Sequence, residues 1–167
     1  MTLSPYTECS NWHHARFMAR LPSLEPAPFD TSPFENTIFE VWPQEDAERA
    51  GEPFLRVMPI ATHLYHGVSA LLREHQASFA ALLTAWNPGR LETDAFNQDA
   101  NRRLLDALHA SGLPVYPARG TSTSGDWFED SFVVVGGSYD QYVAWQEDFE
   151  QLAFVLFRTD GSVWLRW

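Results

Sequence analysis

The segment Trp-Phe-Glu-Asp-Ser-Phe-Val-Val-Val, residues 127–135, has the clearest strand pattern in the chain. Successive side chains of a strand point to opposite faces, so Glu129 shares a face with Trp127 and Ser131. Asp130 then lies on the other face. Both faces also carry large apolar residues, which predicts a strand that is buried on both sides and has one carboxylate per face near its N-terminal end.

Strands and helices mix on either side of this segment. We expect strands at residues 37–42, 54–58, 79–86, 115–118, 152–157 and 163–167, and helices at residues 43–50, from the cap Thr62, at 93–112 and at 139–150. Asp160-Gly161 favours a tight hairpin, whereas Gly120–Gly125 has the composition of a polar loop. The pattern predicts the α/β (α+β) class, with a mixed, partly antiparallel sheet packed by helices.

The two ends of the chain differ in character. Prolines stand at positions 5, 22, 26, 28, 33 and 43, and proline restricts the backbone and removes a donor. We therefore expect residues 1–75 to form an N-terminal arm and elaboration, with a short helix near residues 12–20. Residues 76–167 are expected to form an α/β domain.

Composition excludes several classes of function. The chain has 167 residues, with 22 acidic and 11 basic side chains and a formal net charge of −11. So few cations cannot neutralise a nucleic-acid backbone or hold an anionic membrane surface. Cys9 is the single cysteine, which excludes an internal disulfide. Because the sequence shows neither a signal-peptide pattern nor an apolar run of membrane-spanning length, we expect a cytoplasmic protein.

Two asparagines stand on the apolar face of the helix predicted over residues 93–112. Asn97 and Asn101 are spaced to share a face with Leu104 and Leu108. A buried amide without a partner costs roughly 1–3 kcal/mol. These amides are therefore either tied into a structural network or directed at a ligand.

Glu129 is the candidate catalytic residue, because it lies at the polar end of a buried strand. The alternative is a carboxylate at the rim, or an ion-pair partner of Arg119 or Arg102. Asn87 and Gln151 both lie next to predicted buried strands. The loop at residues 120–125 offers backbone N–H donors, although its glycine spacing matches no phosphate-binding motif.

Four separate sequence blocks follow one another along the chain: Leu83–Pro88 (LTAWNP), Asn97 with Asn101, Gly125–Phe132 (GDWFEDSF) and Phe149–Ala153 (FEQLA). This pattern resembles the bacterial domain of unknown function numbered 3293, over roughly residues 76–167. The resemblance implies a small cytoplasmic α/β domain and carries no activity. The resemblance marks the following residues as positions of the family pattern: Asn87, Asn97, Asn101, Trp127, Glu129 and Gln151.

The leading hypothesis is a small-molecule site, for which a nucleotide or nucleoside is a natural ligand. Asparagine and glutamine can pair with a base edge, and tryptophan can stack on a base. Glu129 would act as acceptor or general base, and the sequence leaves open whether a reaction follows. The predicted ligand-binding residues are Asn87, Asn97, Asn101, Trp127, Ser131 and Gln151, with no cofactor and no metal.

Three alternatives accompany this hypothesis. The acidic last helix suits an interaction or inhibitor protein that meets a basic partner. His63 and His66 suit a metal site, but a third ligand at a recognisable spacing is missing. Trp164 and Trp167 are compatible with the interface of a homo-oligomer as well as with a core.

Overall fold

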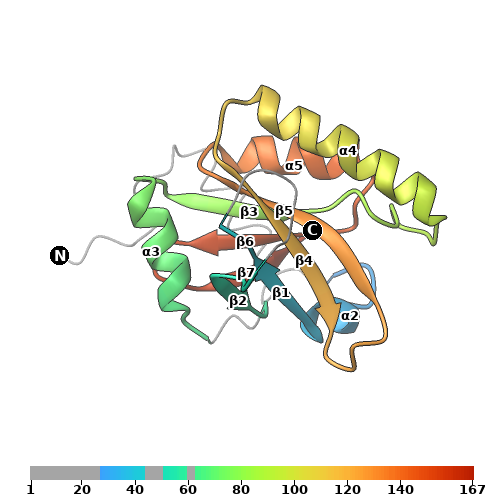
Figure 1. Cartoon of the computed structure of the whole chain (residues 1–167), viewed down its shortest axis with the longest axis horizontal. Coiled ribbons are helices and arrows are strands. Elements are labelled where there is room, and N and C mark those ends of the chain that lie inside the picture. The colour runs from blue at the N-terminus through green and yellow to red at the C-terminus, as the bar shows by residue number, and fades with distance from the viewer. Residues whose placement is uncertain (1–26, 44–50, 60–62) are drawn as a thin grey trace.

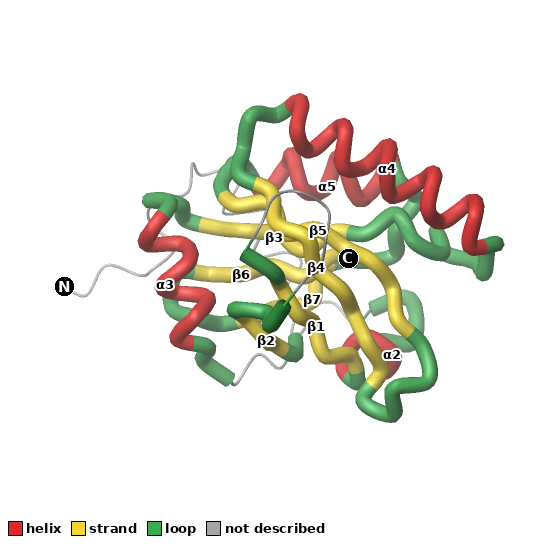
Figure 2. The backbone as a smooth tube through the Cα atoms, viewed as in Figure 1, coloured by secondary structure: helices red, strands yellow, loops and turns green. Residues whose placement is uncertain are grey.

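The computed structural model describes residues 27–43, 51–59 and 63–167, which form one curled sheet with helices packed against it (Figure 1, Figure 2). The strand order is β2-β1-β4-β5-β3-β6-β7, and all neighbouring strands are antiparallel. The elements are α2 (Ser32–Glu35), β1 (Thr37–Val41), β2 (Leu55–Val57), α3 (His66–Glu74), β3 (Phe79–Leu83), α4 (Asp94–Ala110), β4 (Val115–Ser122), β5 (Phe128–Val135), α5 (Tyr139–Asp148), β6 (Phe154–Arg158) and β7 (Val163–Arg166). The predicted α+β class, with helices packed on a sheet that contains antiparallel pairs, is confirmed.

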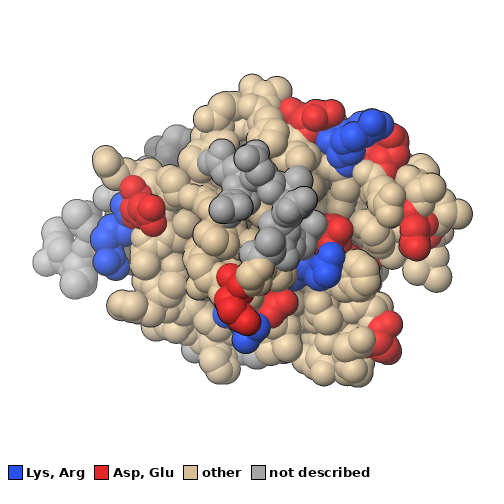
Figure 3. Space-filling view, in the orientation of Figure 1, with Lys and Arg blue, Asp and Glu red and all other residues tan. Residues whose placement is uncertain are grey.

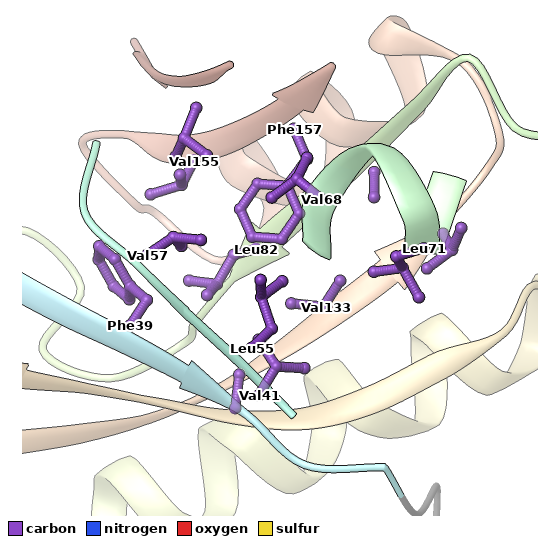
Figure 4. Packing of buried hydrophobic residues seen from close by; sticks show 14 of the residues in the cluster. Phe39, Val41, Leu55, Val57, Val68, Leu71, Leu82, Val133, Val155 and Phe157 are labelled. Carbon is purple, nitrogen blue, oxygen red and sulfur yellow. The ribbon is translucent and has the colours of Figure 1, made fainter. Parts of the chain in front are cut away.

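The two faces of the sheet bury two separate apolar clusters. Leu82 and Val133 point to the face that α3 covers, where they pack with side chains from α3 and from the outer strands (Figure 4). Ala81 and Val134 point to the opposite face, against α4 and α5, which lie together on one side of the sheet (Figure 1). The prediction that β5 is buried on both sides is therefore confirmed for the C-terminal half of that strand.

Most predicted elements are confirmed within a few residues. Thr93 caps α4 by accepting a hydrogen bond from the Phe96 N–H at 3.3 Å. The hairpin between β6 and β7 turns at Gly161, which has φ 86°. The loop predicted at residues 120–125 is wrong for its first half, because residues 120–122 extend β4. Gly120 lies opposite Phe39, whose ring would meet a Cβ at 2.9 Å, so this glycine serves close packing and not a turn.

Some predictions fall outside the described residues. These are the helix near residues 12–20, nearly all of the helix at 43–50, and the cap at Thr62; the helix predicted from Thr62 begins at His66. The described part of residues 1–75 contributes β1, β2 and α3 to the same sheet and core. The division into residues 1–75 and 76–167 stays a prediction. None of the described helices is long and apolar enough to cross a membrane.

The sheet opens where β3 ends. The ladder between β3 and β5 stops at the pair Leu83–Phe132, whereas the ladder between β4 and β5 continues to the pair Thr121–Phe128. After Leu83 the chain leads through residues 84–93 into α4. The N-terminal half of β5, residues 128–131, therefore borders an opening on the side where β3 would otherwise continue.

Candidate functional site

A cleft of about 770 Å³ lies at this opening. Glu129 and Asn87 meet in it, because Asn87 Nδ2 donates a hydrogen bond to Glu129 Oε1 at 3.1 Å. Its walls come from α2, β1, β4, β5, the end of β3 with the segment that follows it, and the starts of α4 and β6. The polar and aromatic side chains that line it are Phe34, Thr37, Phe39, Thr84, Trp86, Asn87, Asp94, Gln98, Arg119, Asp126, Trp127, Phe128, Glu129, Asp130, Ser131 and Phe154.

Asn101 bridges the two strands where they part. Its Oδ1 accepts a hydrogen bond from the Ala85 N–H at 2.7 Å, and its Nδ2 donates to the Asp130 carbonyl at 2.7 Å. The side-chain amide thus takes the place of a peptide group in the interrupted ladder. Thr84 Oγ1 donates to the same carbonyl at 2.8 Å. Because Asn101 is 5% exposed, these bonds satisfy backbone groups that the opening would otherwise leave unpaired.

Asn97 fixes the orientation of Asn87. Asn97 Oδ1 accepts from the Asn87 backbone N–H at 2.8 Å, so Asn97 Nδ2 faces Asn87 Oδ1, at 3.0 Å. The Glu92 N–H donates to the same Oδ1 at 3.1 Å. With Oδ1 accepting two bonds, Nδ2 of Asn87 is the atom that points at Glu129. Two backbone donors therefore determine how both amides are turned.

The backbone of Asn87 also has a particular conformation. Its φ is 47°, in the left-handed region that asparagine tolerates better than most residues. The residue is followed by Pro88, which is buried. This local geometry turns the chain out of the sheet at the position from which the Asn87 side chain reaches Glu129.

Glu129 is a carboxyl in a partly desolvated position. Burial raises its pKa above the ordinary value, and the hydrogen bond from Asn87 acts in the opposite direction. Removal from water penalises the charged form, whereas a donated hydrogen bond favours it. Among the described residues, Asn87 is the one side chain that donates to this carboxylate. The group can therefore accept a further hydrogen bond, or take up a proton, from a molecule in the cleft.

Apolar side chains surround this polar centre. Trp127 and Phe128, at the start of β5, are 38% and 50% exposed, and Leu91 is 90% exposed. The ring centre of Trp86 lies 6.5 Å from that of Phe128. Exposed aromatic surface at the mouth of a cleft is available to cover the apolar part of a ligand.

The turn that precedes Trp127 is bonded within itself. The Ser122 N–H donates to the Trp127 carbonyl at 3.2 Å, and the Gly125 N–H donates to the Ser122 carbonyl at 2.9 Å. Hydroxyl groups of the turn donate to Asp126, which lowers the pKa of that carboxyl. Because these N–H groups bond protein oxygens, they are not the free donors that were expected of residues 120–125.

Arg119 is paired with the neighbour of Glu129. Its Nε lies 2.9 Å from Asp130 Oδ1 across the ladder between β4 and β5, and its guanidinium carbon lies 4.3 Å from the centre of the Phe128 ring. Arg102 pairs instead with Asp99 on α4. The alternative in which Glu129 is an ion-pair partner of either arginine is therefore wrong.

The predicted site residues divide into two groups. Asn87, Trp127, Glu129 and Ser131 line the cleft. Asn97, Asn101 and Gln151 stand behind its wall, and Gln151 Nε2 donates to the carbonyls of Trp86 and Phe149 at 3.3 and 3.2 Å. The second group holds the backbone that carries the first. The binding and catalytic roles stay predictions.

The histidines that the structure describes do not assemble a metal site. Across the described ranges, no three His, Cys, Asp or Glu side chains are grouped so that they could hold a metal ion. His63 precedes α3 and stacks on Tyr65 with ring centres 6.2 Å apart, while His66 begins the helix, so the pair does not share a helix as predicted. His75 packs with its Nε2 2.8 Å from the Tyr116 hydroxyl, as expected of a packed histidine.

Acidic and basic atoms lie next to one another on the face shown in Figure 3. Arg103, for example, lies 3.3 Å from Asp99 on α4. At the end of α5, Glu147, Asp148 and Glu150 are exposed. The alternative of an acidic surface that docks a basic partner protein stays a prediction.

Residues 83–154 match the family described as "Protein of unknown function (DUF3293)". The DUF3293 segment begins at the last residue of β3, ends at the first residue of β6, and includes all seven predicted site residues. The resemblance seen in the sequence is confirmed over this segment. No curated protein and no solved structure matches the chain.

Proposed function

We propose that this protein binds a small molecule in the cleft beside β5, with the Glu129–Asn87 pair as the polar centre of the site. The cleft itself carries the proposal, because a hollow of about 770 Å³ falls in the range of roughly 300–1,000 Å³ that is typical of small-ligand sites. Aromatic side chains with a small number of placed polar groups are also the usual composition of such a site.

Within this proposal, a nucleotide is less favoured than a ligand without phosphates. A flat ring can stack on Trp127 or Trp86, and its N–H groups can donate to Glu129. Phosphate recognition needs cations, and Arg119, the one cationic side chain among the described lining residues, is already paired with Asp130.

Glu129 is the residue to which we assign any acid–base role. A carboxyl whose pKa is raised by burial is suited to general acid–base catalysis. The nearby hydroxyls are less suited to act as nucleophiles. Thr84 donates to the Asp130 carbonyl at 2.8 Å, and Ser131 donates to the Glu129 carbonyl at 3.3 Å. Any reaction in the cleft would therefore use Glu129 as its base.

A thermal-shift screen of the full chain tests this function. The panel contains nucleosides, nucleotides, amines, carboxylic acids and sugars. We expect at least one class to raise the Tm of the wild-type protein, and we expect Trp127→Ala to weaken that response. Phe54→Ala is the matched control, because Phe54 is an exposed aromatic residue that does not line the cleft. A panel without any shift, or shifts that Trp127→Ala leaves unchanged, would contradict the proposal.

We also infer a cytoplasmic location, which the single cysteine supports because reducing compartments do not favour disulfides. Association into a homo-oligomer stays a prediction. The tryptophans that suggested it have partners within the chain: Trp164 Nε1 donates to Ser162 Oγ at 2.8 Å, and Trp167 packs 6.4 Å from Phe29.

A further inference from the structure

We propose that the ligand of the cleft is a small organic cation, an amine attached to an aromatic or aliphatic body, whose N–H groups donate to Glu129. This inference rests on the proposed function, since it assumes that the cleft binds a small molecule. It adds the charge and the hydrogen-bonding character of that molecule.

The hydrogen-bond donors and acceptors of the wall favour a ligand that donates. The Asn87 amide donates to Glu129 at 3.1 Å, and the Thr84 and Ser131 hydroxyls donate to backbone carbonyls. Arg119 Nε donates to the Asp130 carboxylate at 2.9 Å. These four donor atoms already have acceptors within the protein, whereas Glu129 retains accepting capacity. A carboxylate accepts but does not donate, so the complementary ligand group is a donor.

The charge of the wall favours a cation. Four carboxylates, Asp94, Asp126, Glu129 and Asp130, line the cleft against one guanidinium, that of Arg119. Arg119 is paired with Asp130, which leaves the other three carboxylates to set the local charge. Clefts lined by one sign of charge concentrate ligands of the opposite sign and repel those of the same sign. The wall therefore selects cations over anions.

Exposed apolar side chains of the wall suit the hydrocarbon body of such a ligand. Trp127 and Leu91 are exposed beside the polar centre, and aromatic faces attract ammonium groups as well as covering hydrocarbon. Arg119 already lies 4.3 Å over the Phe128 ring, so a cation on an aromatic face occurs in this wall. Gly120, directly opposite Glu129 on β4, adds no side chain that would cover the carboxyl.

The test compares ligands that differ in one functional group. Benzylamine, phenethylamine and tryptamine are titrated into the ¹⁵N-labelled full chain beside the matched alcohols and carboxylic acids, and binding is followed at the tryptophan indole resonances. We expect the amines to bind at least tenfold more tightly than the alcohols, and the acids to bind most weakly. Glu129→Gln, which can still accept from Asn87, is expected to reduce amine affinity to that of the alcohols.

Glu147→Gln is the control, since it removes the same charge from an exposed position on α5. It should leave amine affinity within about twofold of wild type, and circular dichroism should show that both variants are folded. Binding of the alcohols or acids as tight as that of the amines would overturn the inference, as would amine binding that survives Glu129→Gln. If no amine binds while another class in the thermal-shift panel does, the cation inference fails and the proposed function stands. If nothing in the panel binds, the proposed function fails with it.

Discussion

Replacing Asn101 with alanine tests whether a side-chain amide holds the sheet open. The variant loses the bond from the Ala85 N–H and the bond to the Asp130 carbonyl, both 2.7 Å long. The carbonyl keeps the Thr84 hydroxyl as a donor, but the buried N–H loses its side-chain acceptor. Leaving a buried polar group unpaired costs about 1–3 kcal/mol, and the second lost bond adds about 1 kcal/mol. We expect the free energy of unfolding to fall by about 2–4 kcal/mol.

The measurement is urea unfolding followed by tryptophan fluorescence, with the slope of the transition compared between variants. For a chain of this size, that loss corresponds to a Tm decrease of roughly 4–16 °C. Gln98→Ala is the control because Gln98 is an exposed residue of the same helix, and it should stay within about 0.5 kcal/mol of wild type. If Asn101→Ala is as stable as Gln98→Ala, the amide does not hold the interrupted ladder and the reasoning is refuted.

Three further predictions address the residues around the cleft. Asn87→Ala should be about 1 kcal/mol less stable in urea than Asn87→Gly, because only alanine carries a Cβ at φ 47°; equal stability would show that the turn relaxes. Gly120→Ala should lower the free energy of unfolding by about 1–3 kcal/mol, since its Cβ would lie 2.9 Å from Phe39. The control Thr123→Ala, at an exposed position, should change this free energy little. A Gly120→Ala protein as stable as wild type would contradict the packing argument. Burial raises the pKa of Glu129, so the native state holds a proton at pH values where the unfolded chain has already lost it. The stability that this proton contributes is lost as the pH rises through the pKa of the native state. Glu129→Gln should therefore gain stability relative to wild type between about pH 4 and pH 7, and a constant difference would count against the raised pKa.

The sequence predicted the strand and the helix that carry the site, because both depend on local patterns of side chains. Alternation along residues 127–135 placed Glu129 and Ser131 on one face, and both line the cleft, although Asp130, which alternation placed on the opposite face, lines it as well. Helical spacing placed Asn97 and Asn101 on the buried face of α4, and both are buried. Because both amides were predicted to be buried, they also had to have hydrogen-bond partners. That requirement is met in the structure by backbone and side-chain groups of the opened sheet.

What the sequence did not predict depends on strand pairing. The early end of the β3 ladder opens the cleft, and the length of a ladder is not encoded in either strand alone. Pairing of β4 with β5 also joins Arg119 to Asp130, which removes the arginine as a partner of Glu129. A signal was present at Gly120, because glycine within a strand often marks the close approach of another group. Here that group is the Phe39 ring from β1.

The most direct test of the account is the titration of the Glu129 carboxyl by site-resolved ¹³C NMR, with and without benzylamine. We expect a pKa above the ordinary glutamate value in the free protein, since burial raises it, and a higher value still in Asn87→Ala, where the opposing hydrogen bond is lost. Saturation with benzylamine should lower the pKa, because a bound cation favours the carboxylate. An ordinary pKa that responds neither to Asn87→Ala nor to benzylamine would contradict the claim that Glu129 is the oriented, desolvated acceptor of a ligand site.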